Sequence, residues 1–221
     1  MPAPAASNEA TVDRLSWKRG RRAELLEAAR HAIRSAGVAA SMDDVAREAG
    51  VSRVVLYRYF GDKAGLYLAI AEEYVDDLMA RLRSTLADTE DPQLRLRRTT
   101  ETYVDFIQEN RDLYDFLMHR AIREGPAGDL AVGDFVRKVA NQIGRVLEED
   151  ISNLGFDPQP AQAWAHGVVG MVHLATDWWL HSTDVSKEEF VDHMVALMSH
   201  GFVGLASTPG LAEASGLRRV R

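Results

Sequence analysis

The strongest constraint on the fold is the segment 41–60, SMDDVAREAGVSRVVLYRYF, in which two short helical patterns flank a single glycine. Ser41, with Asp44 three residues later, is a pattern typical of a helix start. Gly50 permits the positive φ that a tight turn needs, and Ser52 can cap a second helix. The positions expected to face inward are Val45, Ala46 and Ala49 in the first helix and Val55, Leu56, Tyr59 and Phe60 in the second. The segment therefore predicts two short helices joined by a glycine turn, a helix-turn-helix unit.

The rest of the chain follows helical periodicity, and no segment keeps the two-residue alternation of a strand. Asp91 followed by Pro92 predicts one helix start, and Ser186 with Glu189 predicts another. The expected helices cover about 17–36, 41–49, 52–60, 62–86, 91–109, 112–122, 130–153, 160–181 and 187–205. We predict an all-α fold.

Charge is distributed unevenly along a chain whose net charge is −7. Residues 14–63 hold 11 Lys/Arg against 6 Asp/Glu, whereas residues 64–221 hold 15 against 25. A basic end on an acidic body is typical of a local polyanion-binding surface, although chance clustering on a solvated helix gives the same count.

Composition narrows the class of protein further. The chain has no cysteine, which excludes disulfides, thiolate nucleophiles and cysteine-ligated zinc. No apolar run reaches the length of a membrane span, and residues 1–8 lack the order of a secretory signal. We therefore expect a cytoplasmic protein without a membrane partner.

The residues of the helix-turn-helix segment and those just after it resemble one family closely. The pattern consists of AGVS at 49–52, LYRYF at 56–60, then Asp62, Lys63 and Leu66. Over roughly residues 19–66 it is similar to the DNA-binding domain of TetR-type (TetR/AcrR) transcriptional regulators. The resemblance implies an N-terminal three-helix helix-turn-helix domain and a C-terminal helical bundle for ligand binding and dimerisation. It also implies no cofactor.

The resemblance suggests domain boundaries and a function. We expect a disordered tail over 1–16, the DNA-binding domain over 17–63, the ligand-binding and dimerisation domain over 64–207, and a C-terminal tail over 208–221. The expected function is that of a ligand-responsive repressor. It would bind a palindromic operator in double-stranded DNA as a homodimer and be released by a small apolar effector, with a fatty acyl chain as one candidate.

Roles carried over by position give the expected DNA contacts: Ser41, Ser52, Arg53, Val54, Tyr57, Arg58 and Lys63. Ser41, Tyr57 and Lys63 would contact phosphates, although packing in the core is the alternative for Tyr57. Arg53 would bind a guanine through two hydrogen bonds, and Val54 would lie against a thymine methyl. The family usually has a small residue, often glycine, where this chain has Val54. That difference bears on which operator is recognised rather than on DNA binding itself.

Aromatic, histidine and small residues give the candidates in the C-terminal part. The expected effector contacts are Tyr103, Phe106, Tyr114, Phe116, Leu117, Phe135, Met171, His173 and Trp178, although core packing explains such a set equally. The expected dimer contacts are His166, Gly167, Gly170, Met194, Leu197, Gly201 and Gly204, although packing within one chain could use the same glycines. The stretch 168–179 also resembles actinobacterial lipid-metabolism regulators of the same family, which sense long acyl chains.

Two alternatives belong to other classes of protein. An enzyme is disfavoured because the chain has no glycine-rich phosphate loop, no G-x-S-x-G and no HExxH. His166 and His173, like His193 and His200, lie seven residues and about 10 Å apart along a helix, too far for both to ligate one metal ion. Pairing across helices could still create a site, but we predict none. The second alternative is an architectural helical bundle, which would bind DNA without sequence preference or not at all.

Overall fold

The computed structural model describes the backbone of residues 6–89, 91–120, 126–182 and 184–207, and side chains over 17–89, 91–118, 136–181 and 184–201. Over these residues the chain is helical, with no strand, which confirms the all-α prediction. The elements are α1 (Ala6–Ala36), η1 (Gly37–Ala39), α2 (Met42–Glu48), α3 (Arg53–Phe60), α4 (Lys63–Ala87), α5 (Pro92–Glu109), α6 (Arg111–Asp115), the π-helical turn η2 (Phe116–Arg120), α8 (Pro126–Asn153), α9 (Ala161–Ser182) and α10 (Lys187–Ser207).

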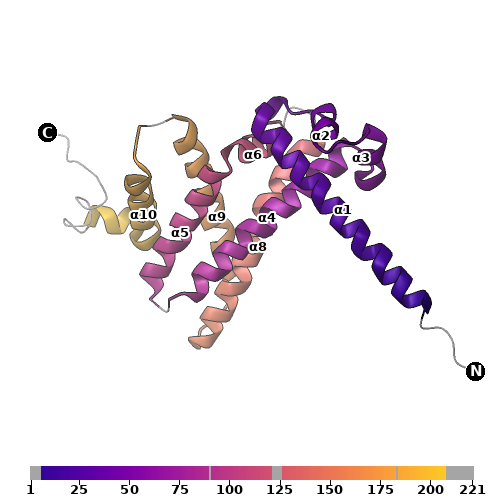
Figure 1. Ribbon diagram of the computed structural model, residues 1–221. Coiled ribbons are helices and arrows are strands. Elements are labelled where there is room, and N and C mark those ends of the chain that lie inside the picture. The colour runs from indigo at the N-terminus through magenta and orange to yellow at the C-terminus, as the bar shows by residue number, and fades with distance from the viewer. Residues whose placement is uncertain (1–5, 90, 121–125, 183, 208–221) are drawn as a thin grey trace, which may run out of the picture. The chain divides into compact units, whose positions relative to one another are not determined.

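The chain forms two compact units, which we call the first unit (residues 1–73 and 111–132) and the second unit (residues 74–110 and 133–221). In the first unit, α2 and α3 lie beside the C-terminal half of α1, as Figure 1 shows. Leu25, Ile33, Leu56 and Leu66 are almost fully buried there. Because these side chains come from α1, α3 and α4, one apolar core holds the two short helices in place.

The second unit packs the remainder of α4 with α5, α8, α9 and α10. Ion pairs attach α10 to α5: Lys187 Nζ lies 2.6 Å from Asp105 Oδ1, and Arg97 pairs with Asp192. At the turn before α10, the ring of Trp179 stacks on Phe190 with centroids 5.1 Å apart.

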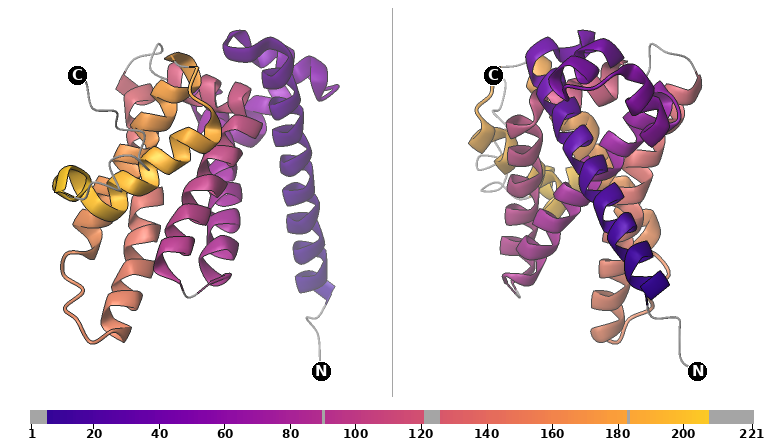
Figure 2. Two further views of the ribbon diagram at one scale, coloured as in Figure 1. Left: turned by 90° about the vertical axis from the view of Figure 1, so that its left-hand side faces the viewer. Right: turned by 45° about the vertical axis from the view of Figure 1, so that its right-hand side comes forward.

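Helix starts follow the predicted caps. Asp91 Oδ1 accepts hydrogen bonds from the backbone of Gln93 (2.8 Å) and Leu94 (3.1 Å), with Pro92 at the first helical position. Ser186 and Glu189 form the reciprocal bonds of a capping box. Near its end, α10 is interrupted at Gly201, whose φ of 61° is non-helical, and Figure 2 shows the yellow end of the helix turning away there.

The boundaries differ from the expected ones. Helix α1 begins at Ala6, so it includes residues 6–16 of the segment for which disorder is expected, and the sequence there holds no proline or glycine. Residues 111–132 group with the N-terminal helices, because α6 and η2 contact α1 and η1. The expected C-terminal tail, 208–221, lies outside the described residues. None of the helices over the described residues combines the length and the hydropathy that a membrane span requires.

Candidate DNA-binding site

A capping box fixes the start of α2. Ser41 Oγ accepts from the backbone amide of Asp44 at 3.3 Å, and Asp44 Oδ2 accepts from the backbone amide of Ser41 at 2.9 Å. The hydrogen bonds from Ser41 hold the pKa of the Asp44 carboxyl below its usual value. The Ser41 hydroxyl also donates its hydrogen to the Asp44 carboxylate. In the structure, the hydroxyl predicted to contact a phosphate is therefore engaged in capping α2.

The turn between α2 and α3 depends on Gly50, which adopts a φ of +62°. The next amide, that of Val51, donates to the carbonyl of Ala46 at 3.0 Å and closes the turn. Ser52 occupies the N-cap position of α3, but its side chain makes no capping hydrogen bond, which corrects the expectation that it caps the helix. Its exposed hydroxyl is therefore not used to start α3.

Helix α3 presents four side chains to solvent, which we call the outer face of α3: Arg53, Val54, Tyr57 and Arg58. Val54 is 75% exposed and Tyr57 41% exposed, unusually high for an apolar and an aromatic side chain. On the opposite side, Leu56 is fully buried and Phe60 is 9% exposed, as predicted. The helix is thus anchored by one side and free along the other.

Arg53 is held by a carboxylate that the sequence analysis did not single out. Its Nε and Nη2 donate to the two carboxylate oxygens of Asp43, on α2. This pairing raises the pKa of Arg53, with a smaller contribution from Tyr57. Along the same face, the guanidinium carbon of Arg58 lies 5.8 Å from the ring centre of Tyr59. Asp43 is ten residues from Arg53, a separation that carries no periodic signal.

Lys63 is the first residue of α4, directly after the loop that follows α3. Its Nζ lies 5.4 Å from the ring centre of Tyr67, and the side chain is half-buried. Asp62 Oδ1 accepts from the backbone amide of Gly65 at 2.7 Å and so caps this helix. A cation in the first turn after the loop that follows α3 is suited to contact a phosphate, the role that the resemblance implies.

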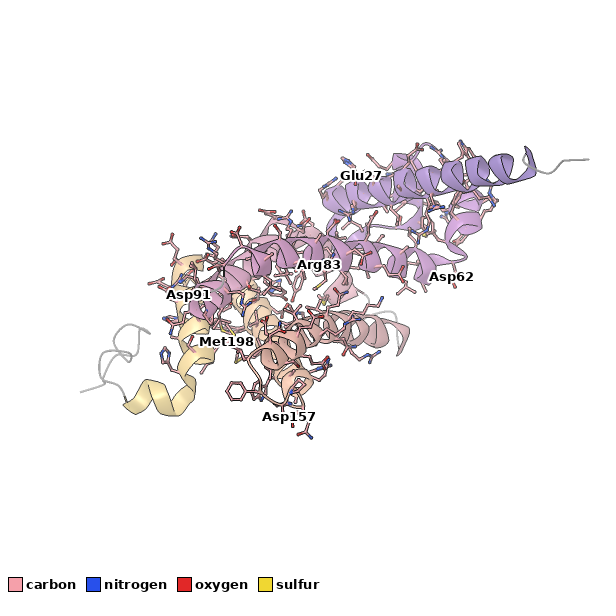
Figure 3. All side chains as sticks on the ribbon, turned by 90° about the horizontal axis from the view of Figure 1, so that it is seen from below. Glu27, Asp62, Arg83, Asp91, Asp157 and Met198 are labelled. Carbon is pink, nitrogen blue, oxygen red and sulfur yellow. The ribbon has the colours of Figure 1, made fainter. Side chains whose placement is uncertain are left out.

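The second unit contains an apolar cavity of about 80 Å³. Its wall consists of Leu82 of α4, Leu96, Thr99, Thr100 and Tyr103 of α5, Val139 and Ile143 of α8, Val168, Val169 and Val172 of α9, and Met198 of α10 (labelled in Figure 3). The hydroxyls of Thr99 and Thr100 donate to backbone carbonyls of α5 at 2.7 and 2.9 Å. Because the threonine hydroxyls are satisfied within their own helix, the wall is effectively apolar.

One polar pair borders this cavity. The Tyr103 hydroxyl lies 3.2 Å from Nδ1 of the buried His173, to which it can donate a hydrogen bond. Burial raises the pKa of Tyr103 well above its ordinary range and lowers the pKa of His173, against a weaker opposing effect of Asp177. Both rings are therefore uncharged at neutral pH.

Most of the predicted effector contacts lie elsewhere. Among the side chains that the structure describes, only Tyr103 of that set lines the cavity, with His173 directly behind it. Phe106 packs on Tyr74, with ring centroids 4.8 Å apart. The remaining members are Tyr114, Phe116 and Leu117, which are buried in the first unit, Met171 and Trp178, which are half-buried and exposed on α9, and Phe135, whose side chain lies outside the described residues. Most of these positions were chosen from the sequence because their side chains are aromatic or polarisable. The valines and threonines that line the cavity have no residue type that distinguishes them from ordinary core positions.

Helix α9 carries an uncovered apolar face. Trp164, Leu174 and Trp178 are 56%, 69% and 54% exposed, and nothing lies within 4 Å of a Cβ built on Gly167. We call these four residues the outer face of α9. The sequence analysis included Gly167 in the dimer set and Trp178 in the effector set but missed Trp164 and Leu174. The seven-residue intervals 164–171–178 and 167–174 are the signal that could have found them.

The other predicted dimer residues are placed unequally. Gly170 has open space around it, and His166 is exposed, with its ring Nδ1 2.8 Å from the carbonyl of Gln162. Leu197 is half-buried on α10, which also contains Gly201 and Gly204. Met194 is 6% exposed and packs inside its own unit, so it is not available to a partner. No group of three His, Asp or Glu among the described side chains could hold a metal ion.

Two family models match this chain. Residues 25–70 match the bacterial regulatory proteins of the tetR family, and residues 81–216 match the tetracyclin repressor-like C-terminal domain. An uncharacterised HTH-type transcriptional regulator of Mycobacterium tuberculosis is 29% identical over 194 residues, covering 87% of this chain and 82% of that protein. The HTH-type transcriptional activator FasR of Mycolicibacterium smegmatis is 30% identical over 177 residues, covering 79% and 80%.

Solved structures share the fold. A TetR-family regulator from Syntrophomonas wolfei superposes with a TM-score of 0.68 at 19% identity, covering 85% of this chain and 97% of that one. The transcriptional regulator FadR of Bacillus subtilis, solved with stearoyl-CoA, gives 0.62 at 16% identity, covering 81% and 98%. The family and these relatives are transcriptional regulators rather than enzymes. The chain belongs to the TetR family and is a helix-turn-helix transcriptional regulator.

Proposed function

We propose that this regulator recognises a palindromic operator as a homodimer and that an uncharged apolar effector, bound in the cavity of the second unit, lowers its affinity for that DNA. The observation that carries the proposal is the outer face of α3. It presents Arg53, Val54, Tyr57 and Arg58 to solvent on a helix anchored by the buried Leu56 and Phe60. A short helix of this kind fits the major groove and exposes donors and an apolar group to base edges.

The outer face of α9 supports the dimer. Two tryptophans and a leucine on one helix face expose apolar surface to water. Burial of this surface against a partner is favourable, and exposed apolar patches often mark such interfaces. Gly167 lets a second helix approach closely. A twofold dimer places two copies of α3 against half-sites one DNA turn apart, about 34 Å.

The chemistry of the cavity defines the effector class. Its wall is aliphatic, and the bordering Tyr103 and His173 are neutral, so a charged group would lose its hydration without a compensating partner. FadR of Bacillus subtilis binds stearoyl-CoA, which makes an acyl chain the first candidate. Pockets for drug-sized ligands have volumes of about 300–1,000 Å³, so a cavity of 80 Å³ must expand to admit a long chain.

Helix α4 gives a path for the coupling. It begins at Lys63, directly after the DNA-contacting helix, and carries Leu82 of the cavity wall within the same continuous helix. A ligand that moves Leu82 therefore acts on an element that also carries a predicted phosphate contact. A coupling of about 1–3 kcal/mol would lower operator affinity by about 5- to 150-fold.

Selection of bound sequences from a random DNA pool tests the DNA half of the proposal. We expect an enriched inverted repeat, and Arg53→Ala should abolish the preference at one base pair in each half-site. A pool that shows no enrichment would instead support the architectural bundle.

Sedimentation of the free protein tests the dimer. Trp164→Glu, which puts a charge on the outer face of α9, should convert it to monomer, whereas Lys138→Glu on α8 should not.

Titration with straight-chain fatty alcohols, fatty acids and acyl-CoA esters of increasing length tests the effector half. We expect the alcohols to bind more tightly than acids of equal length and to release operator DNA. If no member of the series changes operator affinity, the effector proposal is wrong.

The proposed sign of regulation is repression, relieved when the effector releases the operator. The name of the relative FasR indicates that an activator occurs among similar proteins. A reporter gene placed behind the selected operator separates the two signs, since deletion of the regulator should raise expression for a repressor and lower it for an activator.

A further inference from the structure

The carboxylate of Asp43 occupies one complete edge of the Arg53 guanidinium. Nε donates to Oδ1 and Nη2 donates to Oδ2, so the two planar groups meet through parallel hydrogen bonds. The guanidinium comes from the outer face of α3 and the carboxylate from the first turn of α2. Both side chains are about half exposed, at 52% and 54%.

Counting donors shows which ones the pair with Asp43 does not use. A guanidinium has five N–H donors, and the pair with Asp43 uses one on Nε and one on Nη2. The other three are two on Nη1 and one on Nη2. One hydrogen from each terminal nitrogen forms the end edge of the fork, which matches O6 and N7 of guanine. The ion pair thus leaves intact the edge that recognises guanine.

Neither the start of α2 nor the stability of the first unit requires the Asp43 carboxylate. The capping box of α2 is made by Ser41 and Asp44, and Asp43 takes no part in it. A solvent-exposed ion pair also contributes little to folding stability. A carboxylate beside a DNA-binding face moreover repels phosphates, so under the proposed function we expect Asp43 to lower the affinity for DNA in general.

We propose that Asp43 is a specificity-determining positioning residue, which orients Arg53 so that its free end edge binds guanine and which makes other bases poorer partners. The inference rests on the proposed function, because it assumes that Arg53 enters the major groove. Fixing one edge of the guanidinium removes rotamer freedom before DNA is bound, and the fork then has one direction to offer. Asp43 does not contact the base itself.

The test compares full-length variants in selection from a random DNA pool, followed by affinity measurements on the selected operator and on single-base changes of it. Asp43→Asn keeps the size of the side chain and removes its charge. Asp43→Ser, which keeps a small polar group in the first turn of α2, is measured in parallel in case one variant does not fold. Glu48→Gln is the matched control, since Glu48 is an exposed acid on the same helix and lies five residues further on.

We expect both Asp43 variants and the control to bind non-specific DNA slightly more tightly, because each removes one negative charge. In Asp43→Asn and Asp43→Ser, the preference for guanine over the next-best base should fall by about fivefold at one position of each half-site, within the range that a good bidentate contact supplies. Glu48→Gln should leave that preference unchanged. Adding Asp43→Asn to Arg53→Ala should cause no further loss, since the effect of Asp43 passes through Arg53.

Each other outcome has a distinct meaning. If the wild-type protein enriches no motif, the proposed function fails and this inference fails with it. If the wild type enriches a motif that depends on Arg53, but a folded Asp43 variant keeps the full guanine preference, only the role of Asp43 is overturned. A loss of preference that persists in the Arg53→Ala background also overturns it, because Asp43 would then act without Arg53. Thermal unfolding of each variant establishes which ones are folded.

Discussion

The outer face of α3 and the cavity of the second unit are candidate binding sites built in opposite ways. The α3 site consists of exposed, mostly polar side chains on one eight-residue helix, supported by the short helix α2 and by buried side chains of the long helices α1 and α4. The cavity is lined by mostly apolar side chains drawn from five long helices, with Leu82 and Met198 more than a hundred residues apart in the chain. The α3 site depends on the exposed side chains of one short segment. The cavity depends on the volume that remains between segments distant in the chain.

This contrast explains how each site can change. A side chain on the outer face of α3 has few neighbours, so its replacement alters recognition and leaves packing intact. A side chain in the cavity wall also belongs to the core, so its replacement alters stability and ligand fit together. Under the proposed function, operator preference can therefore vary independently of folding, whereas effector preference cannot.

The largest expected effect is the difference in stability between a substitution on the buried side of α3 and one on its exposed side. Leu56→Ala removes a fully buried side chain and should lower the free energy of unfolding by about 2–5 kcal/mol, with loss of DNA binding. Val54→Ala, two residues away and 75% exposed, should change it by no more than about 0.5 kcal/mol and alter only operator preference. Urea unfolding followed by circular dichroism measures the free energy of unfolding of both variants. Equal losses of this free energy would show that α3 is not anchored as described.

Filling the cavity tests whether the two sites can be separated. Val172→Phe adds a ring to the cavity wall and should weaken binding of the best fatty alcohol at least tenfold, while overpacking lowers stability by about 1–3 kcal/mol. DNA affinity without ligand should be unchanged. Leu94→Phe, at an exposed position of α5, is the control. Ligand binding that survives Val172→Phe would place the effector site elsewhere.

A charge on the DNA side should act on all DNA sequences alike. Lys63→Ala should weaken specific and non-specific binding by similar factors and reduce the slope of log affinity against log salt by about one. Fluorescence anisotropy over a salt series measures the slope. Lys138→Ala, at an exposed lysine of the second unit, serves as the comparison. An unchanged slope in Lys63→Ala would remove Lys63 from the phosphate contacts.

The smallest expected effect concerns pH and the border of the cavity. Burial lowers the pKa of His173 in the folded chain below its ordinary value of 6.5, so below about pH 6.5 the unfolded chain takes up a proton that the folded chain does not. The free energy of unfolding should therefore fall as the pH drops from 6.5 toward the lowered pKa. His173→Gln should flatten this part of the profile, and His166→Gln, which leaves the buried ring in place, is the control. A profile unchanged by His173→Gln would contradict the assignment.

Most of the fold could be predicted because its signals are local. Ser41 with Asp44, Asp91 with Pro92, and Ser186 with Glu189 each mark a helix start within three residues, and the structure forms all three caps. Helix α1 begins at Ala6, before the start expected near residue 17, and helix boundaries are the part of an element that a pattern defines least sharply. The cavity wall was mostly missed, because valines and threonines at helical spacing look the same whether they face another helix or an empty volume.

By itself, the sequence determined where the two short helices begin and turn, and that Leu56 and Phe60 of α3 face inward, because capping, positive φ and helical periodicity act over a few residues. The tertiary structure alone decided that Arg53 meets Asp43, that Tyr103 meets His173, and that Leu82 and Met198 border one cavity. These pairings depend on how helices distant in the chain pack against one another. The free energy of that packing is shared among many side chains, none of which marks its partner in advance.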